Sequence, residues 1–301
     1  MIDSLINKSW ALEARFHNVQ AALMLKRLQG GTGMAGLSDA FRAEREKHNP
    51  FFVIPGAYQD DQEDNYAKPH VGVSRNFNTV PSKSGHVAVI PIIGTMTRYG
   101  GMCSYGSEDI ANWIIEANSI DAVTAIVLEI NSGGGEVDGT ELLSAVVKQS
   151  KKPIVAYVTG MAASAAYWVA SQCREIVMES ATTSDVGSIG VLAMHVDSSA
   201  FFEKEGHKVT IVRSDGSEDK ALFNSVEPLS PSILDTVKTE LNLIRETFIN
   251  TVKAGRPNIS QNVFSGKMYP GRDAIKLGMA DRIGYLGDAV YRADLLARKG
   301  N

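Results

Sequence analysis

Apolar residues in the middle of the chain form short, nearly continuous runs separated by amphipathic segments. The runs at residues 86–93, 122–130 and 153–158 consist mainly of β-branched and aliphatic residues. This composition is typical of strands, and the lack of alternation at 122–130 indicates a strand that is buried on both faces, as in a parallel sheet. Helical spacing fills the gaps, over about 107–118 and 139–149. Strands that alternate with helices predict an α/β layered fold built from βαβ-like units.

The C-terminal half continues this alternation with shorter strands and one long helix. An amphipathic pattern predicts a helix from Pro231 to Ala254, with Ser230 as its N-cap and Gly255 at its end. We also expect short strands at 175–178, 189–194 and 208–213 and a short helix at 198–204.

The first 85 residues differ in pattern from the rest. Residues 1–53 are expected to form a helical N-terminal extension, because Trp10, Leu12 and other apolar residues recur at roughly helical spacing. Residues 54–85 contain prolines, glycines and an acidic run, which is the composition of a linker or surface arm. The sequence therefore predicts one main folded domain over residues 86–301.

Composition excludes several classes of protein. The 301 residues are 44% apolar and 21% charged, which is ordinary for a globular protein. A net charge of −4 gives no reason to expect a nucleic-acid partner. Cys103 and Cys173 are too few for a disulfide framework, and no cysteine–histidine spacing predicts a metal site. The N-terminus lacks the pattern of a signal peptide, and no apolar stretch is long enough for a membrane span. We therefore expect a soluble, cytoplasmic chain without a membrane anchor.

Ser164 is the first candidate for chemistry. It follows the strand-like run at 153–158 and Gly160, and it begins a helix of small residues. Unpaired backbone N–H groups at a helix start favour a developing negative charge. Several hydrolase folds present a nucleophilic serine on such a strand-to-helix turn. A serine is also a preferred N-cap, so a purely structural role stays open.

Two further features are candidates for the same site. The glycines at 133–135 follow a buried strand, and their amides could hold an oxyanion or a phosphate, although glycine clusters more often mark plain turns. A serine nucleophile also needs a base. A lysine can serve when burial lowers its pKa, and Lys220 is the candidate, although a loop lysine is more often solvated. None of the histidines stands in an obvious catalytic context (His17, His48, His70, His86, His195, His207).

Four blocks in a fixed order resemble the signal peptide peptidase A family of serine peptidases, family S49. They are Ile-Asn-Ser-Gly-Gly-Gly at 130–135, Gly-Met-Ala-Ala-Ser-Ala-Ala at 160–166, Asp-Val-Gly-Ser-Ile-Gly-Val at 185–191 and the stretch at 268–284. The resemblance covers residues from about 86 to 292. It implies a Clp protease/crotonase-like fold of repeated ββα units.

The resemblance also implies a Ser–Lys dyad. Ser164 corresponds to the nucleophile of the family, and Lys220 corresponds to its general base. The oxyanion hole corresponds to the backbone amides of Gly134, Gly135 and Ala165. Clp proteases use a Ser-His-Asp triad instead, but the region that holds their histidine has none here. No metal or cofactor is implied.

The chain departs from the family pattern at two points. Gly133 stands where the family usually has a proline, and the sequence predicts no N-terminal anchor of the kind that membrane-associated members carry. Anchor-free relatives from phages and prophages are associated with capsid maturation. The resemblance therefore implies a phage-type head protease that cuts polypeptide, including capsid scaffold protein, in the host cytoplasm or the prohead. It also implies a homo-oligomer, since relatives form rings.

Other functions stay open from sequence. The chain could be a signal-peptide or quality-control peptidase within the same family. A crotonase-like acyl-CoA enzyme would share the fold and the oxyanion hole without needing a serine nucleophile. A catalytically silent assembly protein would keep the residues without their chemistry.

Overall fold

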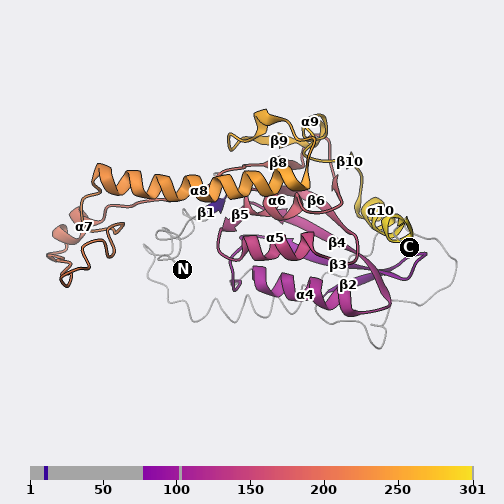
Figure 1. The fold of residues 1–301 in the computed structure, drawn as a ribbon, viewed down its shortest axis with the longest axis horizontal. Helices are drawn as coiled ribbons and strands as arrows, with labels where there is room; N and C mark the ends of the chain where they lie inside the picture. The colour runs from indigo at the N-terminus through magenta and orange to yellow at the C-terminus, as the bar shows by residue number, and fades with distance from the viewer. Residues whose placement is uncertain (1–9, 13–76, 102–103, 300–301) are drawn as a thin grey trace.

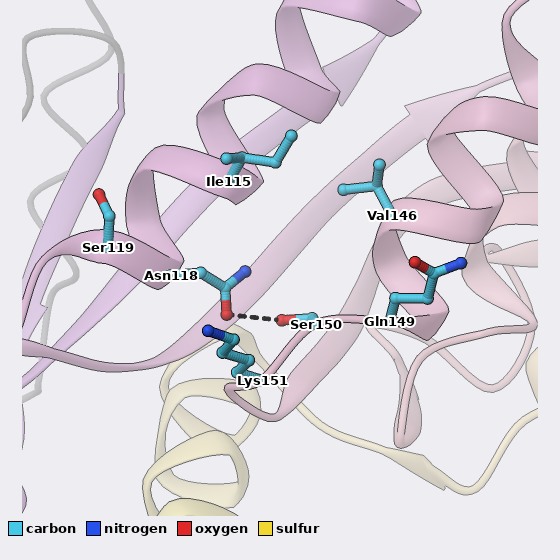
Figure 2. A pocket seen from close by; sticks show the side chains of 7 residues that line it. All are labelled: Ile115, Asn118, Ser119, Val146, Gln149, Ser150 and Lys151. Carbon is cyan, nitrogen blue, oxygen red and sulfur yellow. Dashed lines mark hydrogen bonds between the residues drawn. The ribbon is translucent and has the colours of Figure 1, made fainter.

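The computed structural model describes residues 10–12, 77–101 and 104–299, and Figure 1 shows the fold. Its centre is a sheet with the strand order β10-β7-β6-β4-β3-β2, in which neighbours from β3 to β10 are parallel and β2 is antiparallel to β3. The strands are β2 (Asn78–Pro81), β3 (His86–Ile93), β4 (Val123–Ser132), β6 (Ile154–Ala163), β7 (Glu175–Met178) and β10 (Arg282–Ile283).

Strand β6 changes partner along its length. Its first half pairs with β7, whereas its last residues pair with β8 (Asp185–Gly187), which in turn pairs antiparallel with β9 (Met268–Pro270). The C-terminal end of β6 is therefore held by β8 as well as by β4. This end carries the candidate nucleophile.

Helices cover both faces of the sheet, as the buried strand pattern predicts (Figure 1). Alternate residues of β4 point to opposite sides: Ile126 and Leu128 join one buried cluster, while Ala125 and Val127 join the other. The first cluster includes α4 (Ser107–Ser119), α5 (Thr140–Lys148) and α6 (Ala165–Ala170), and the second includes α10 (Leu286–Lys299). The short α9 (Gly271–Lys276) and the 3₁₀ turn η1 (Gln261–Val263) complete the C-terminal part.

Residues 191–247 form an arm that extends beyond the sheet, at the left of Figure 1. The arm contains α7 (Ser199–Lys204) and the N-terminal two thirds of α8 (Pro231–Gly255), and none of its residues is buried. The C-terminal end of α8 is anchored through Phe248, whose ring stacks on Trp168 of α6 with 4.5 Å between centroids. Both rings are fully buried. The arm is thus attached to the rest of the chain through a contact with α6, the helix that begins directly after Ser164.

Most of the predicted elements from residue 86 onward are confirmed, but two short strands are not. Residues 208–213 form no strand, and residues 189–194 contain only a single bridge residue, while β8 lies just before them. Both segments have the apolar composition of strands. A strand also requires a partner, and within the described ranges 208–213 has none. The predictions of strands at 189–194 and 208–213 are therefore wrong, because strand composition does not supply a pairing partner.

The N-terminal predictions also need correction where the structure describes them. Residues 10–12, expected to be helical, form strand β1 (Trp10–Leu12), which pairs antiparallel with β5 (Gly134–Glu136). The pairing supplies backbone hydrogen bonds that override a weak helical periodicity. Residues 78–81 belong to the sheet as β2 and not to a linker. The remainder of the extension at 1–53, and residues 54–76, lie outside the described residues.

Among the described residues, no helix combines the length and apolarity needed to cross a bilayer.

Candidate active site

Ser164 stands between β6 and α6 in an unusual backbone conformation. Its φ of 55° and ψ of −118° match the first central position of a type II′ turn, which normally requires glycine. The backbone N–H of Ser164 donates to the carbonyl of Gly187 at 2.8 Å, which fixes the turn against β8. Ser164 occupies the N-cap position of α6, but its side chain makes no capping hydrogen bond. A strained serine at a strand-to-helix turn is the geometry of a nucleophile elbow.

The hydroxyl of Ser164 is enclosed. The residue is 1% exposed, and its Oγ donates a long hydrogen bond of 3.4 Å to the carbonyl of Gly190. Such a long bond holds the hydroxyl weakly. The side chain is therefore positioned by the backbone turn and not by a strong side-chain partner.

The glycine turn forms strand β5 beside this helix start, and α6 packs against it. One side of β5 is used by Met96: its N–H donates to the carbonyl of Gly134, and its carbonyl accepts from the N–H of Glu136, both at 2.9 Å. A Cβ atom on Gly135 would overlap the Met96 backbone, so only glycine fits there. Since alternate residues of a strand point their N–H and C=O groups to opposite sides, those of Gly135 face away from Met96.

The structure distinguishes among the predicted oxyanion donors. The amide of Gly134 donates to the Oγ of Ser132 at 3.1 Å, and that hydroxyl donates to the carbonyl of Gly94 at 2.6 Å. The Gly134 amide is therefore already paired. Ala165 is the first residue of α6, and the N–H at that position has no partner within the helix. The Gly135 amide faces the other side of β5, where its neighbour is strand β1. Displacement of β1 would expose the Gly135 amide, so the geometry favours Gly135 and Ala165 as the two donors.

Lys220 does not lie where the expected dyad would place it. It is exposed in the arm, where its N–H donates to the carbonyl of Ser217 at 3.1 Å and its carbonyl accepts from Arg213 at 2.6 Å. Arg213 also pairs with Glu227, which lowers the pKa of that carboxyl to about 2. The expected desolvation of Lys220 is not present in the single chain. The structure brings together Ser164 and the glycine amides but leaves the lysine outside.

None of the histidines in the described ranges takes the place of Lys220 as a base for Ser164. His86 opens β3 and so lies at the N-terminal edge of the parallel sheet, opposite to the edge where β6 delivers Ser164. The Nε2 of His195 lies 2.6 Å from the carbonyl of Asn224 within the arm, and His207 is exposed there. The geometry therefore gives no support to a serine–histidine pair in the described ranges.

Two residues that sequence reasoning missed shape the site. Met96 supplies backbone pairing to β5 from 39 positions earlier in the chain, for which no local signal exists. The Oγ of Ser132 accepts a hydrogen bond from the Gly134 amide. The position of Ser132 directly before the glycines is a sequence signal from which this contact could have been predicted. Cys173 is buried, as expected for a small core residue, and burial raises the pKa of its thiol. No cluster of possible metal ligands is found within the described ranges.

Comparison with known proteins identifies the family. The profile of peptidase family S49 matches residues 147–299, half of the chain, and the Clp protease profile matches residues 99–182. The chain belongs to peptidase family S49. The expected family and the Clp protease-like α/β fold are thereby confirmed.

Relatives within the family come from different sources. A putative protease of Methanocaldococcus jannaschii is 33% identical over 63% of this chain and 61% of its own length. The capsid assembly protease C of Escherichia phage lambda is 32% identical over 71% of this chain and 50% of its own length. This S49 chain therefore spans between half and two thirds of these relatives. A solved membrane-bound stomatin-specific protease, 1510-N, with a substrate peptide is 16% identical, covers 70% of this chain and 81% of its own, and superposes with a TM-score of 0.39.

Proposed function

We propose that this S49 chain is a serine endopeptidase that hydrolyses extended polypeptide with a Ser164–Lys220 dyad. The observation that carries the proposal is the strained type II′ conformation of Ser164 at the start of α6, beside a strand whose Gly135 amide faces away from Met96. A serine used only for capping or packing would not need this backbone conformation. Membership of a peptidase family supports the same reaction class.

The proposed mechanism assigns each group one role. The amine of Lys220 takes the proton of the Ser164 hydroxyl as Oγ attacks the scissile carbonyl. The backbone amides of Gly135 and Ala165 hold the resulting oxyanion, and a donor of this kind contributes about 3 kcal/mol to the transition state. The lysine then protonates the leaving amine, and water hydrolyses the acyl-enzyme.

Lys220 reaches Ser164 in this proposal from a second copy of the chain. The arm that carries it has no buried residue and exposes large apolar side chains, including Phe201 at 63% and Val212 at 87%. Segment 208–213 has strand composition and no partner in the described part of the chain. Docking of the arm on a neighbour would bury these groups and remove Lys220 from water, which favours its neutral form. The homo-oligomer is thus part of the catalytic proposal.

The names of two relatives support the substrate class of this proposal. The lambda relative carries the name of a capsid assembly protease, and the related protein of Enterobacteria phage P21 is named a head-tail preconnector protein. We therefore include processing of a phage scaffold protein as the finer form of the proposal. The proposed location is the prohead or the host cytoplasm.

Mixing two inactive variants tests this proposal. Ser164→Ala and Lys220→Met chains are each expected to leave casein intact. If the dyad forms between copies, mixing them in equal amounts restores about one quarter of the sites, because only one of four neighbour combinations supplies both groups. Lys238→Met, an exposed lysine of the same arm, is the matched control and should stay active.

The result separates the alternatives. Activity in the mixture establishes a dyad shared between chains, whereas inactive single variants with an inactive mixture would place both groups within one chain. Full activity of Lys220→Met would refute its role as the base. If wild type neither cuts casein nor labels at Ser164 with a fluorophosphonate probe, the acyl-CoA enzyme and the silent assembly protein regain support.

A further inference from the structure

On the side of β5 that faces away from Met96, the backbone pairs with the protein's own N-terminal segment. Strand β1 pairs antiparallel with β5, so that Trp10 lies opposite Glu136, Ala11 opposite Gly135 and Leu12 opposite Gly134. Met96 uses the other side of β5. Strand β5 thus has backbone partners on both sides in this structure.

The register of the β1–β5 pairing places Ala11 against the backbone of Gly135. The N–H and C=O of Gly135 point away from Met96, so they face β1, where Ala11 is their partner. The amide of Gly135 is also the donor that the proposed mechanism needs for the oxyanion. The backbone of Ala11 therefore lies opposite the amide that would otherwise receive a scissile carbonyl.

Strand β1 pairs with β5 through main-chain groups, as an added peptide strand would. An extended peptide added to a sheet edge gains its affinity from such main-chain pairing. The chain runs from Trp10 opposite the far end of β5 to Leu12 opposite Gly134, next to the turn at Ser132. All three residues of β5 are buried, as is Ser164. An external polypeptide would have to displace β1 to pair with this strand.

We propose that residues 10–12 are a built-in occupant of the substrate strand position, which competes with polypeptide substrates for β5. This inference rests on the proposed peptidase function, because β5 is a substrate position only if Ser164 is the nucleophile. The segment acts through its backbone, so it blocks the site without requiring a particular side chain. Access to Ser164 depends on release of β1.

The test uses full-length chains with one change in β1. Ala11→Pro removes the N–H that would pair with Gly135, and proline is poorly tolerated inside a paired strand. Ala35→Pro, in the glycine-rich stretch outside β1, is the matched control. The first readout is hydrogen exchange of the peptide that covers residues 133–137, measured in the Ser164→Ala background so that no cleavage occurs. The second readout is the rate at which a fluorophosphonate labels Ser164 in otherwise wild-type chains.

Ala11→Pro is expected to speed exchange at 133–137 and to raise the labelling rate on the order of tenfold, the upper end of the factor expected for the loss of one backbone hydrogen bond. Ala35→Pro should change neither. Equal exchange in Ala11→Pro and its parent would overturn the inference, whatever the activity. If exchange responds but no chain labels at Ser164, the occupant is real and the proposed peptidase function fails instead. If exchange responds and labelling occurs at an unchanged rate, β1 does not compete for the site and the inference fails.

Discussion

The strained turn at Ser164 makes a quantitative prediction about stability. A residue with a Cβ atom held at φ 55° and ψ −118° carries a strain of about 1–3 kcal/mol. Ser164→Gly removes the Cβ and this strain, at a cost of about 0.5–1 kcal/mol in the entropy of the unfolded chain. Ser164→Ala keeps the Cβ and the strain. The glycine variant should therefore be more stable than the alanine variant by about 1 kcal/mol, although both lack the hydroxyl.

The assay is urea unfolding of both variants, followed by circular dichroism, with equal slopes as the condition for comparing midpoints. A difference of this size corresponds to about 2 °C in Tm for a chain of this length. Ser171 provides the control, because it is buried at the other end of α6 with φ −60°. There glycine should be less stable than alanine. An alanine variant at 164 as stable as the glycine variant would refute the strained turn, and with it the main structural argument for a nucleophile.

Three further changes test the surroundings of the site. Gly135→Ala places a Cβ against the Met96 backbone and should cost about 1–3 kcal/mol while abolishing labelling of Ser164. Phe248→Ala removes the ring that stacks on α6 and should lower the free energy of unfolding by about 3–5 kcal/mol. Glu129→Gln should stabilise the fold at pH 7, because burial and then the charge of Glu179 raise the pKa of this carboxyl, so that its ionised form opposes folding. The gain should vanish as the pH falls below the ordinary value of 4.5, where the carboxyl is protonated in both states.

Matched controls keep these results specific. Gly287→Ala adds a Cβ in open space and should leave labelling unchanged. Tyr285→Ala removes a ring that is 71% exposed and lies outside the arm, and it should barely change the unfolding midpoint. Glu203→Gln changes an exposed carboxyl and should show no stabilisation at pH 7. An active Gly135→Ala, a Phe248→Ala as stable as its control, or a pH-independent effect at Glu129 would each contradict the corresponding contact.

Elements with a complete local signal were predictable from the sequence. The buried run at 122–130 became β4, and the pattern after Ser230 became α8, with the Ser230 hydroxyl accepting from the N–H of Ile233 as an N-cap. Ser164 was found because its strand, its glycine and its helix all lie within a few positions. In each case the determining interactions are close in sequence.

The incorrect predictions concern residues whose structural partners are distant in sequence. Residues 10–12 form a strand because β5, more than 120 positions away, offers its backbone. Residues 208–213 have strand composition, yet composition cannot supply the partner that a strand requires. Lys220 is a similar case. Its position in the sequence fits the family, but its surroundings in the single chain do not desolvate it. Local pattern predicts conformation better than it predicts pairing.

The stack of Phe248 on Trp168 gives helix α8 the properties of a lever. A helix rises 1.5 Å per residue, so its first turn at Pro231 lies about 25 Å from this contact. Tilting such a rod by about 10° about the stack would displace its far end by about 4 Å. Small rearrangements in the packing of the helix that begins at Ser164 are thus amplified at the arm that carries Lys220. The packing around each Ser164 is therefore mechanically connected to the lysine that the same chain would offer to its neighbour in the proposed dyad.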